Sequence, residues 1–109
     1  MNYKIKYKIW FEKDGEIVMG HGREELLRKI DEVGSIKKAA EELGITYKKA
    51  WEYINAMEKR LGVKLLETQR GGAKGGGSKL TKEARKILED FKRVENEFEK
   101  LKNKLEKNG

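Results

Sequence analysis

The first eleven residues alternate between apolar and charged positions. Apolar side chains occupy the odd positions from Tyr3 to Phe11, and lysines stand between them at positions 4, 6 and 8. A period of two is typical of a β-strand with one buried face. Trp10 interrupts the alternation and marks either the end of this strand or a second contact. Asp14-Gly15 then signals a hairpin turn, and residues 17–19 can form the returning strand.

Three stretches with apolar residues three and four positions apart come next. Their spacing predicts helices over residues 23–33, 36–43 and 47–61, with Gly20-His21-Gly22 as a loop before the first. Ser35 and Thr46 are suitable caps for the second and third helices. Each helix is followed by a glycine, at positions 34, 44 and 62, where a left-handed residue can end it.

The last third of the chain predicts a hairpin and one long helix. Residues 63–68 indicate a short strand, residues 70–78 a glycine-rich loop, and Lys79-Leu80 a strand that pairs back. Thr81 can cap a final helix that runs to about Glu106. The expected fold class is therefore mainly α (α+β), a winged helix-turn-helix with an N-terminal β-hairpin. Residues 1–80 form the hairpin and winged domain, and residues 81–109 its C-terminal dimerisation helix.

Residues 36–55 have the pattern of a helix-turn-helix. Ala40 is small where the two helices cross, Gly44 accepts the positive φ of the turn, and Ile45 anchors the turn to the core. The outer face of the second helix carries groups suited to base edges and phosphates. An ordinary helical hairpin with a solvated face is the alternative, and an exposed Trp51 argues against it. The predicted DNA-binding residues of this motif are Ser35, Lys37, Thr46, Tyr47, Lys48, Lys49, Trp51 and Asn55.

Charge is concentrated on the same part of the chain. The net charge is +7, which suggests a polyanionic partner such as nucleic acid or an anionic membrane surface. Residues 44–80 hold eight basic and three acidic side chains, so five of the seven surplus charges lie there. The glycine-rich loop lacks the lysine that a phosphate-binding P-loop needs before its serine. A flexible wing is the better interpretation, with Arg70, Lys74 and Lys79 directed at DNA phosphates.

The final helix carries an apolar heptad pattern. Such a repeat is typical of a coiled-coil seam, and a helix of about 26 residues would span about 39 Å. That length is too great to be buried against so small a domain. The alternative, a helix that packs only on its own core, is expected for residues 84–88. The sequence leaves the direction of a partner helix open. The predicted dimerisation residues are Ile87, Phe91, Val94, Phe98, Leu101 and Leu105.

Several classes of function find no support in the sequence. The chain has no cysteine and one histidine, so neither a disulfide framework nor a zinc site is expected. No carboxylate pair or activated nucleophile stands out, and we expect no enzyme activity, no cofactor and no metal. His21 is assigned no role. The sequence shows neither a signal peptide nor an apolar run of membrane-spanning length, which predicts a soluble cytoplasmic protein without a membrane partner.

The motif residues resemble a known family. Gly34-Ser35-Ile36, Gly44-Ile45-Thr46-Tyr47-Lys48, Ala50-Trp51 and the later Gly75-Gly76-Gly77 are similar to the N-terminal DNA-binding domain of ModE-type molybdate-responsive regulators. The similarity extends from about Lys4 into the last helix. A looser similarity to LysR-type regulators covers residues 35–66.

This resemblance implies a dimeric winged-helix regulator of molybdate or tungstate genes. In ModE-type regulators C-terminal domains bind the oxyanion, so this chain is expected to lack its own oxyanion-binding domain. A separate effector-binding protein is then a possible partner. Lys49 and Tyr53 stand where the family pattern has small residues, which predicts a different target sequence.

The sequence as a whole predicts a transcription regulator that binds duplex DNA selectively and forms a homodimer. Two alternatives stay open at this point. One is an architectural protein that uses the same charges to bind DNA without sequence preference. The other is a protein-interaction module whose function is the coiled coil, with the basic surface incidental to it.

Overall fold

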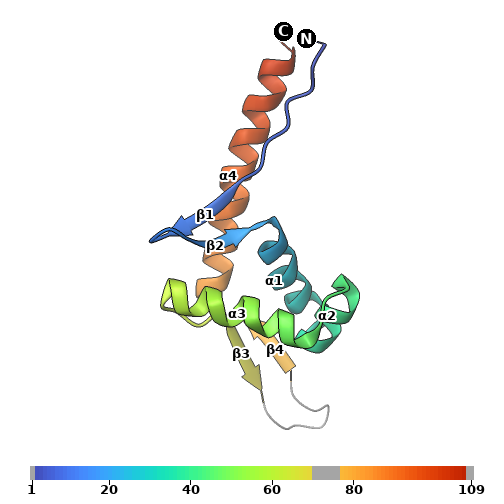
Figure 1. The fold of residues 1–109 in the computed structure, drawn as a ribbon, viewed down its shortest axis with the longest axis vertical. Helices are drawn as coiled ribbons and strands as arrows, with labels where there is room; N and C mark the ends of the chain where they lie inside the picture. The colour runs from blue at the N-terminus through green and yellow to red at the C-terminus, as the bar shows by residue number, and fades with distance from the viewer. Residues whose placement is uncertain (1, 70–76, 108–109) are drawn as a thin grey trace.

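The computed structural model describes residues 2–69 and 77–107. The molecule is elongated, with extents of 58 × 30 × 23 Å, because its last helix projects well beyond the rest (Figure 1). None of the helices in these ranges is both long and apolar enough to cross a membrane. The elements in chain order are β1 (Trp10–Lys13), β2 (Glu16–Gly20), α1 (His21–Val33), α2 (Ile36–Leu43), α3 (Tyr47–Leu61), β3 (Leu66–Gln69), β4 (Gly77–Leu80) and α4 (Lys82–Lys107).

The caps of the central helices form as the sequence predicts. The Ser35 hydroxyl accepts a hydrogen bond from the Lys38 N–H at 3.1 Å, and the Thr46 hydroxyl accepts one from the Lys49 N–H at 3.0 Å. Gly44 ends α2 with a φ of 72°, a left-handed conformation that glycine adopts without steric cost. The turn between α2 and α3 is therefore determined locally, which places α3 at a defined angle to α2.

One apolar core holds α1, α2, α3, the wing strands and the first turns of α4 together. The fully buried residues Leu27, Ile30 and Ile54 lie at its centre. Thr81 joins the base of the wing to α4, since its hydroxyl donates to the Lys64 carbonyl at 2.7 Å and accepts from the Ala84 N–H at 3.1 Å. The winged domain and the start of α4 thus form one packed unit.

The predicted N-terminal strand is mostly absent. Only Trp10–Lys13 pairs with β2, because the register begins at Trp10 opposite Gly20 and the chain then turns into α1. The residues before Trp10 instead run along α4 (Figure 1). There the Ile5 N–H donates to Glu106 at 3.0 Å and the Tyr7 hydroxyl donates to Glu99 at 2.6 Å.

The prediction of a loop at Gly20-His21-Gly22 is also wrong. His21 is the first residue of α1, and Gly20 is the N-cap in an extended conformation. The glycines on either side suggested a loop, but Gly22 is accommodated within the first turn of the helix. This places the imidazole of His21 on a helix that faces α4.

The wing is a two-stranded antiparallel hairpin. Leu66 pairs with Leu80 and Thr68 with Ser78, which confirms the predicted pair of strands, although residues 63–65 lie outside β3. Of the predicted glycine-rich loop, residues 70–78, residues 70–76 lie outside the described residues, whereas Gly77 and Ser78 belong to β4 because they pair with Gln69 and Thr68. The Ser78 N–H donates to the Gly34 carbonyl at 3.0 Å, so β4 is attached to the turn that precedes α2.

Candidate nucleic-acid interface

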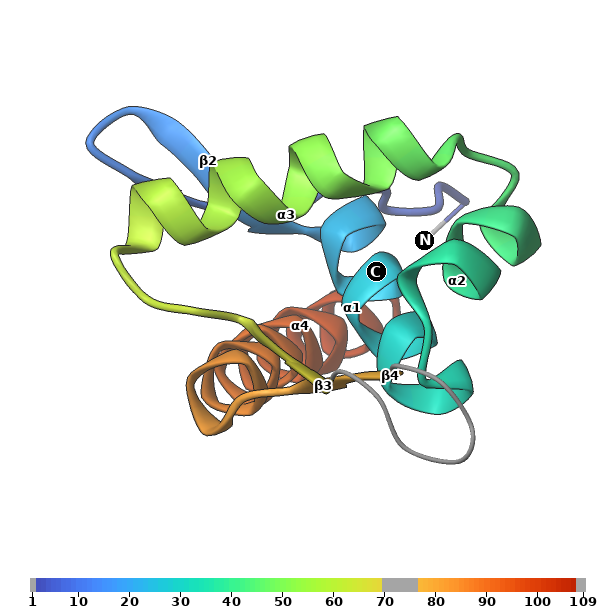
Figure 2. The same cartoon turned by 90° about the horizontal axis from the view of Figure 1, so that it is seen from below.

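The helix-turn-helix and the wing lie together at one end of the molecule. Figure 1 shows α2, α3 and the strands β3 and β4 at the end opposite to the projecting C-terminal part of α4. Figure 2 looks onto that end and shows α3 beside α2, with the wing strands across from them and α4 seen along its axis. The predicted DNA-binding elements therefore share one end of the fold.

The polar residues predicted on the outer face of α3 are accessible. Tyr47 is 51% exposed, and Lys48 and Asn55 are also exposed. Their hydroxyl, ammonium and amide groups can donate to phosphates or to base edges. Asn55 lies two turns after Tyr47, so the accessible polar side chains extend along more than one turn of the helix.

Trp51 differs from the prediction of an exposed aromatic residue. It is half-buried and packs against the core, and its ring meets the Tyr47 ring edge to face with centroids 6.3 Å apart. An amphipathic tryptophan supplies packing on one side and an N–H on the other. Trp51 therefore supports the position of Tyr47 at the start of α3.

A shallow groove of about 230 Å³ separates the helix-turn-helix from the wing. Its walls come from the start of α2, the first turns of α3 and both wing strands. Because Ser35 is the N-cap of α2, the free N–H groups and the positive end of the helix dipole lie beside it. Such a helix start, with hydroxyls and a lysine around it, is suited to a phosphate group. The polar lining comprises Ser35, Lys37, Tyr47, Thr68 and Ser78.

The predicted cations are not equally free. Lys49 lies 3.9 Å from Glu52 and 5.3 Å from the centre of the Tyr53 ring, and Lys79 lies 3.8 Å from Glu67. Within residues 2–69 and 77–107, Lys37 and Lys48 are exposed and form no ion pair. Among the predicted DNA-binding residues in the described ranges, these two lysines are thus the cations available to an incoming phosphate.

Two further predicted contacts fall in the wing tip, and one basic residue has another role. Arg70 and Lys74 lie outside the described residues. Arg60, which contributes to the basic surplus, donates to the Ile17 carbonyl at 2.8 Å and pairs with Glu16 at 2.8 Å. It therefore attaches β2 to α3. The sequence missed Thr68 and Ser78 in the groove because nothing in a short strand shows which side faces α2.

The predicted dimerisation residues divide into two groups. Ile87 is half-buried on the core, and Phe91 is fully buried, with its ring 5.1 Å from Phe11. The prediction that Phe91 contacts a partner helix is wrong, because the N-terminal hairpin covers that turn of α4. Val94 is half-buried beyond it. The remaining three, each 46–49% exposed, are Phe98, Leu101 and Leu105.

The comparisons with known proteins agree with this geometry. Residues 24–85, from α1 into the start of α4, match the family described as bacterial regulatory helix-turn-helix protein, lysR family. The chain belongs to the LysR family of helix-turn-helix proteins. The matched residues include both helices of the motif, α2 and α3.

Several relatives of this LysR-family chain are regulators named ModE. It is 42% identical over 67 residues to the transcriptional regulator ModE of Haemophilus influenzae, covering 62% of this chain and 26% of the relative. It is 38% identical over 73 residues to the molybdenum-pterin-binding protein MopB of Rhodobacter capsulatus, covering 67% and 27%. The chain therefore spans about a quarter of the length of these relatives.

A solved structure shows the same fold. The crystal structure of the CbnR_DBD–DNA complex matches with a TM-score of 0.58 at 24% identity, over 80% of this chain and 94% of that one. The match confirms the winged helix-turn-helix with its long C-terminal helix.

Proposed function

We propose that this protein binds a specific duplex sequence by inserting α3 into the major groove while the wing and the start of α2 hold phosphates. The observation that carries the proposal is the exposed polar face of α3 next to a wing, at one end of the molecule. A helix-turn-helix reads bases with the first turns of its second helix. Tyr47, Lys48 and Asn55 occupy those turns and the following one.

The base readout is assigned to Asn55 and Lys48. An asparagine amide offers one donor and one acceptor, which matches the major-groove edge of adenine. A lysine at the start of the helix reaches a guanine edge or a phosphate. Lys37, Ser35 and Ser78 then position the duplex, because contacts to phosphates fix register without specifying sequence.

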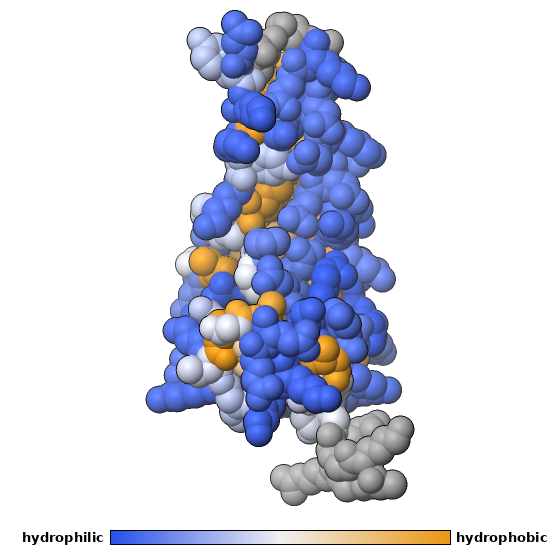
Figure 3. All heavy atoms as spheres, turned by 90° about the vertical axis from the view of Figure 1, so that its right-hand side faces the viewer, coloured by the Kyte–Doolittle hydropathy of each residue, from blue (hydrophilic) through white to orange (hydrophobic). Residues whose placement is uncertain are grey.

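The protein acts as a homodimer in this proposal. Tyr7 packs beside Phe98 with ring centroids 6.2 Å apart, yet Phe98, Leu101 and Leu105 stay about half exposed on the projecting part of α4. A second copy of the same helix would cover this apolar surface. Figure 3 shows apolar atoms in patches among polar ones along this elongated part. Two α3 helices related by a dimer axis would contact half-sites about one helical turn, roughly 34 Å, or a multiple of it apart.

The genes it controls are proposed to be related to molybdate or tungstate. The support is the similarity to ModE and MopB, and to the relative from Azotobacter vinelandii named molybdenum transport protein ModE, which is 36% identical over 67 residues. In this role the protein acts in the cytoplasm and catalyses no reaction. Sites selected from genomic DNA should then lie near genes for molybdate or tungstate transport or use.

The test compares Asn55→Ala with wild type on a selected site and on a random duplex at one salt concentration. We expect the variant to lose about 1–3 kcal/mol of binding free energy on the selected site and far less on random DNA. Lys100→Ala is the matched surface control, because Lys100 lies on the projecting part of α4. Equal losses by Asn55→Ala on both duplexes would favour the architectural alternative.

A further inference from the structure

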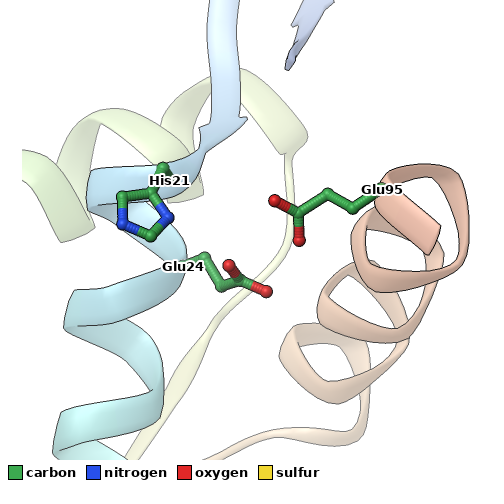
Figure 4. Close-up of side chains that lie close together, drawn as sticks. All are labelled: His21, Glu24 and Glu95. Carbon is green, nitrogen blue, oxygen red and sulfur yellow. The ribbon is translucent and has the colours of Figure 1, made fainter. Parts of the chain in front are cut away.

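Three potential metal ligands meet between α1 and α4. His21 and Glu24 are three residues apart on one face of α1, and Glu95 faces them from α4. One ligand atom from each side chain lies within 4.8 Å of those of the other two. Figure 4 shows the two carboxylates pointing toward each other across the gap, with the imidazole beside Glu24.

Glu24 is an unusual member of this cluster because it is buried. Its residue is only 6% exposed, and a buried carboxylate is stable only when cations or donors compensate its charge. Arg28 donates twice, at 3.2 and 3.3 Å, and both bonds end on Oε2 of Glu24. Within the described ranges Oε1 accepts no hydrogen bond and is not fully buried, so this oxygen stays accessible on the side of Glu95.

Charged side chains of both signs surround the cluster. Glu25 lies 3.4 Å from Nε2 of His21, so a further carboxylate faces the imidazole. The hydrogen bond from Tyr7 to Glu99, burial, and the charges of Glu99 and Glu95 together raise the pKa of Tyr7 to about 12. These carboxylates share the cavity beside α4 with three lysines, Lys6, Lys8 and Lys102.

A solvent path leads to the cluster. His21 and Glu95 line a cavity of about 410 Å³ between the N-terminal segment and α4, together with Tyr7 and Lys102. The ammonium of Lys102 pairs with Glu99 at 3.7 Å and with Glu106 at 3.3 Å, so its charge is shared with carboxylates outside the cluster. An ion in this cavity can reach His21 and Glu95 directly, and Glu24 lies within 4.8 Å of both.

We propose that His21, Glu24 and Glu95 bind one divalent transition-metal ion of the zinc or cobalt type. One imidazole nitrogen and two carboxylate oxygens leave a fourth position for water, a set that suits these ions. Bonds of about 2.0–2.2 Å place tetrahedral ligand atoms roughly 3.4 Å apart. The separations of up to 4.8 Å must then shrink by roughly 1.4 Å, which rotations of the long Glu95 side chain and the exposed His21 ring can supply.

The ion would connect the DNA-binding core to the helix proposed for dimerisation. Glu95 lies between the buried Phe91 and the half-exposed Phe98 of α4. A link from Glu95 to α1 through the ion would fix the direction in which the projecting part of α4 leaves the core. The site itself does not depend on the proposed function, because its ligands all lie outside α3 and the wing.

The test adds Zn²⁺ or Co²⁺ alone to protein dialysed against a chelator. His21 is the only histidine in the chain, so its imidazole NMR signals report on the site directly. We expect one ion per chain by calorimetry, a visible absorption band for Co²⁺, and a shift of the His21 signals that saturates with the same affinity. His21→Ala and Glu95→Gln should each weaken binding by at least about tenfold.

Glu97→Gln is the matched control for the lost charge. Glu97 is exposed on the same helix and pairs with Lys100 at 3.4 Å, away from the cluster. It should leave the affinity unchanged, and circular dichroism checks that all variants fold. The proposal is overturned if wild type binds no ion, if the His21 signals stay unchanged while an ion binds, or if Glu97→Gln weakens binding as much as Glu95→Gln.

Discussion

Thr81 offers the sharpest test of how the wing and α4 are joined. The residue is buried, and its hydroxyl makes two hydrogen bonds, one to the base of the wing and one as the cap of α4. Thr81→Val keeps the shape and removes both bonds. Loss of the cap costs about 1 kcal/mol, and the partly buried Lys64 carbonyl left without its donor costs about 1 kcal/mol more.

We therefore expect Thr81→Val to lower the free energy of unfolding by about 2 kcal/mol. Thr81→Ser keeps the hydroxyl and loses one methyl group, which costs about 0.8 kcal/mol. Urea unfolding followed by circular dichroism, at one fixed protein concentration, measures the free energy of unfolding of both variants. If Thr81→Val lost no more stability than Thr81→Ser, the hydroxyl would not join the two elements as described.

Three further predictions concern charge, assembly and titration. Lys48→Ala should weaken binding to all duplexes and reduce the slope of log affinity against log salt concentration by about 0.9. The control Lys100→Ala should leave both unchanged. An unchanged slope in Lys48→Ala would exclude a phosphate contact by Lys48. Phe98→Lys should shift sedimentation toward monomer while Asn96→Lys does not, and a wild-type monomer at tens of micromolar would refute the dimer. Tyr7 is neutral in its bond to Glu99, so that bond contributes fully below pH 10 and is lost as pH rises through about 12. Tyr7→Phe should remove the absorbance change that ionisation of the Tyr7 phenol gives near pH 12. If the wild-type protein showed no such change, the hydrogen bond from Tyr7 to Glu99 would be contradicted.

The elements with local signals could be predicted from the sequence. Ser35 and Thr46 each cap the helix that follows, and Gly44 ends α2 in a left-handed conformation, because all three depend on neighbouring residues alone. The apolar spacing of α3 is equally local. The helix-turn-helix, and with it the exposed Asn55, followed from residues within about twenty positions of one another.

The features that depend on distant contacts could not be predicted. The alternation of apolar and charged residues up to Phe11 fits both a paired strand and an extended segment that lies on α4. Only the length of β2 decides how many of these residues pair as a strand. A heptad likewise does not show whether Phe91 is covered by its own chain or by a partner. His21 and Glu95 are 74 positions apart in the numbering, so only the packing of α1 on α4 brings them together.

Sequence selectivity is the central claim, and one ratio tests it most directly. The dissociation constant of the wild-type protein should be measured on a site selected from genomic DNA and on a shuffled duplex of the same composition, at one salt concentration. Base readout by α3 predicts at least about a thousandfold tighter binding to the selected site. A ratio near one would contradict it and identify the protein as a binder of DNA in general.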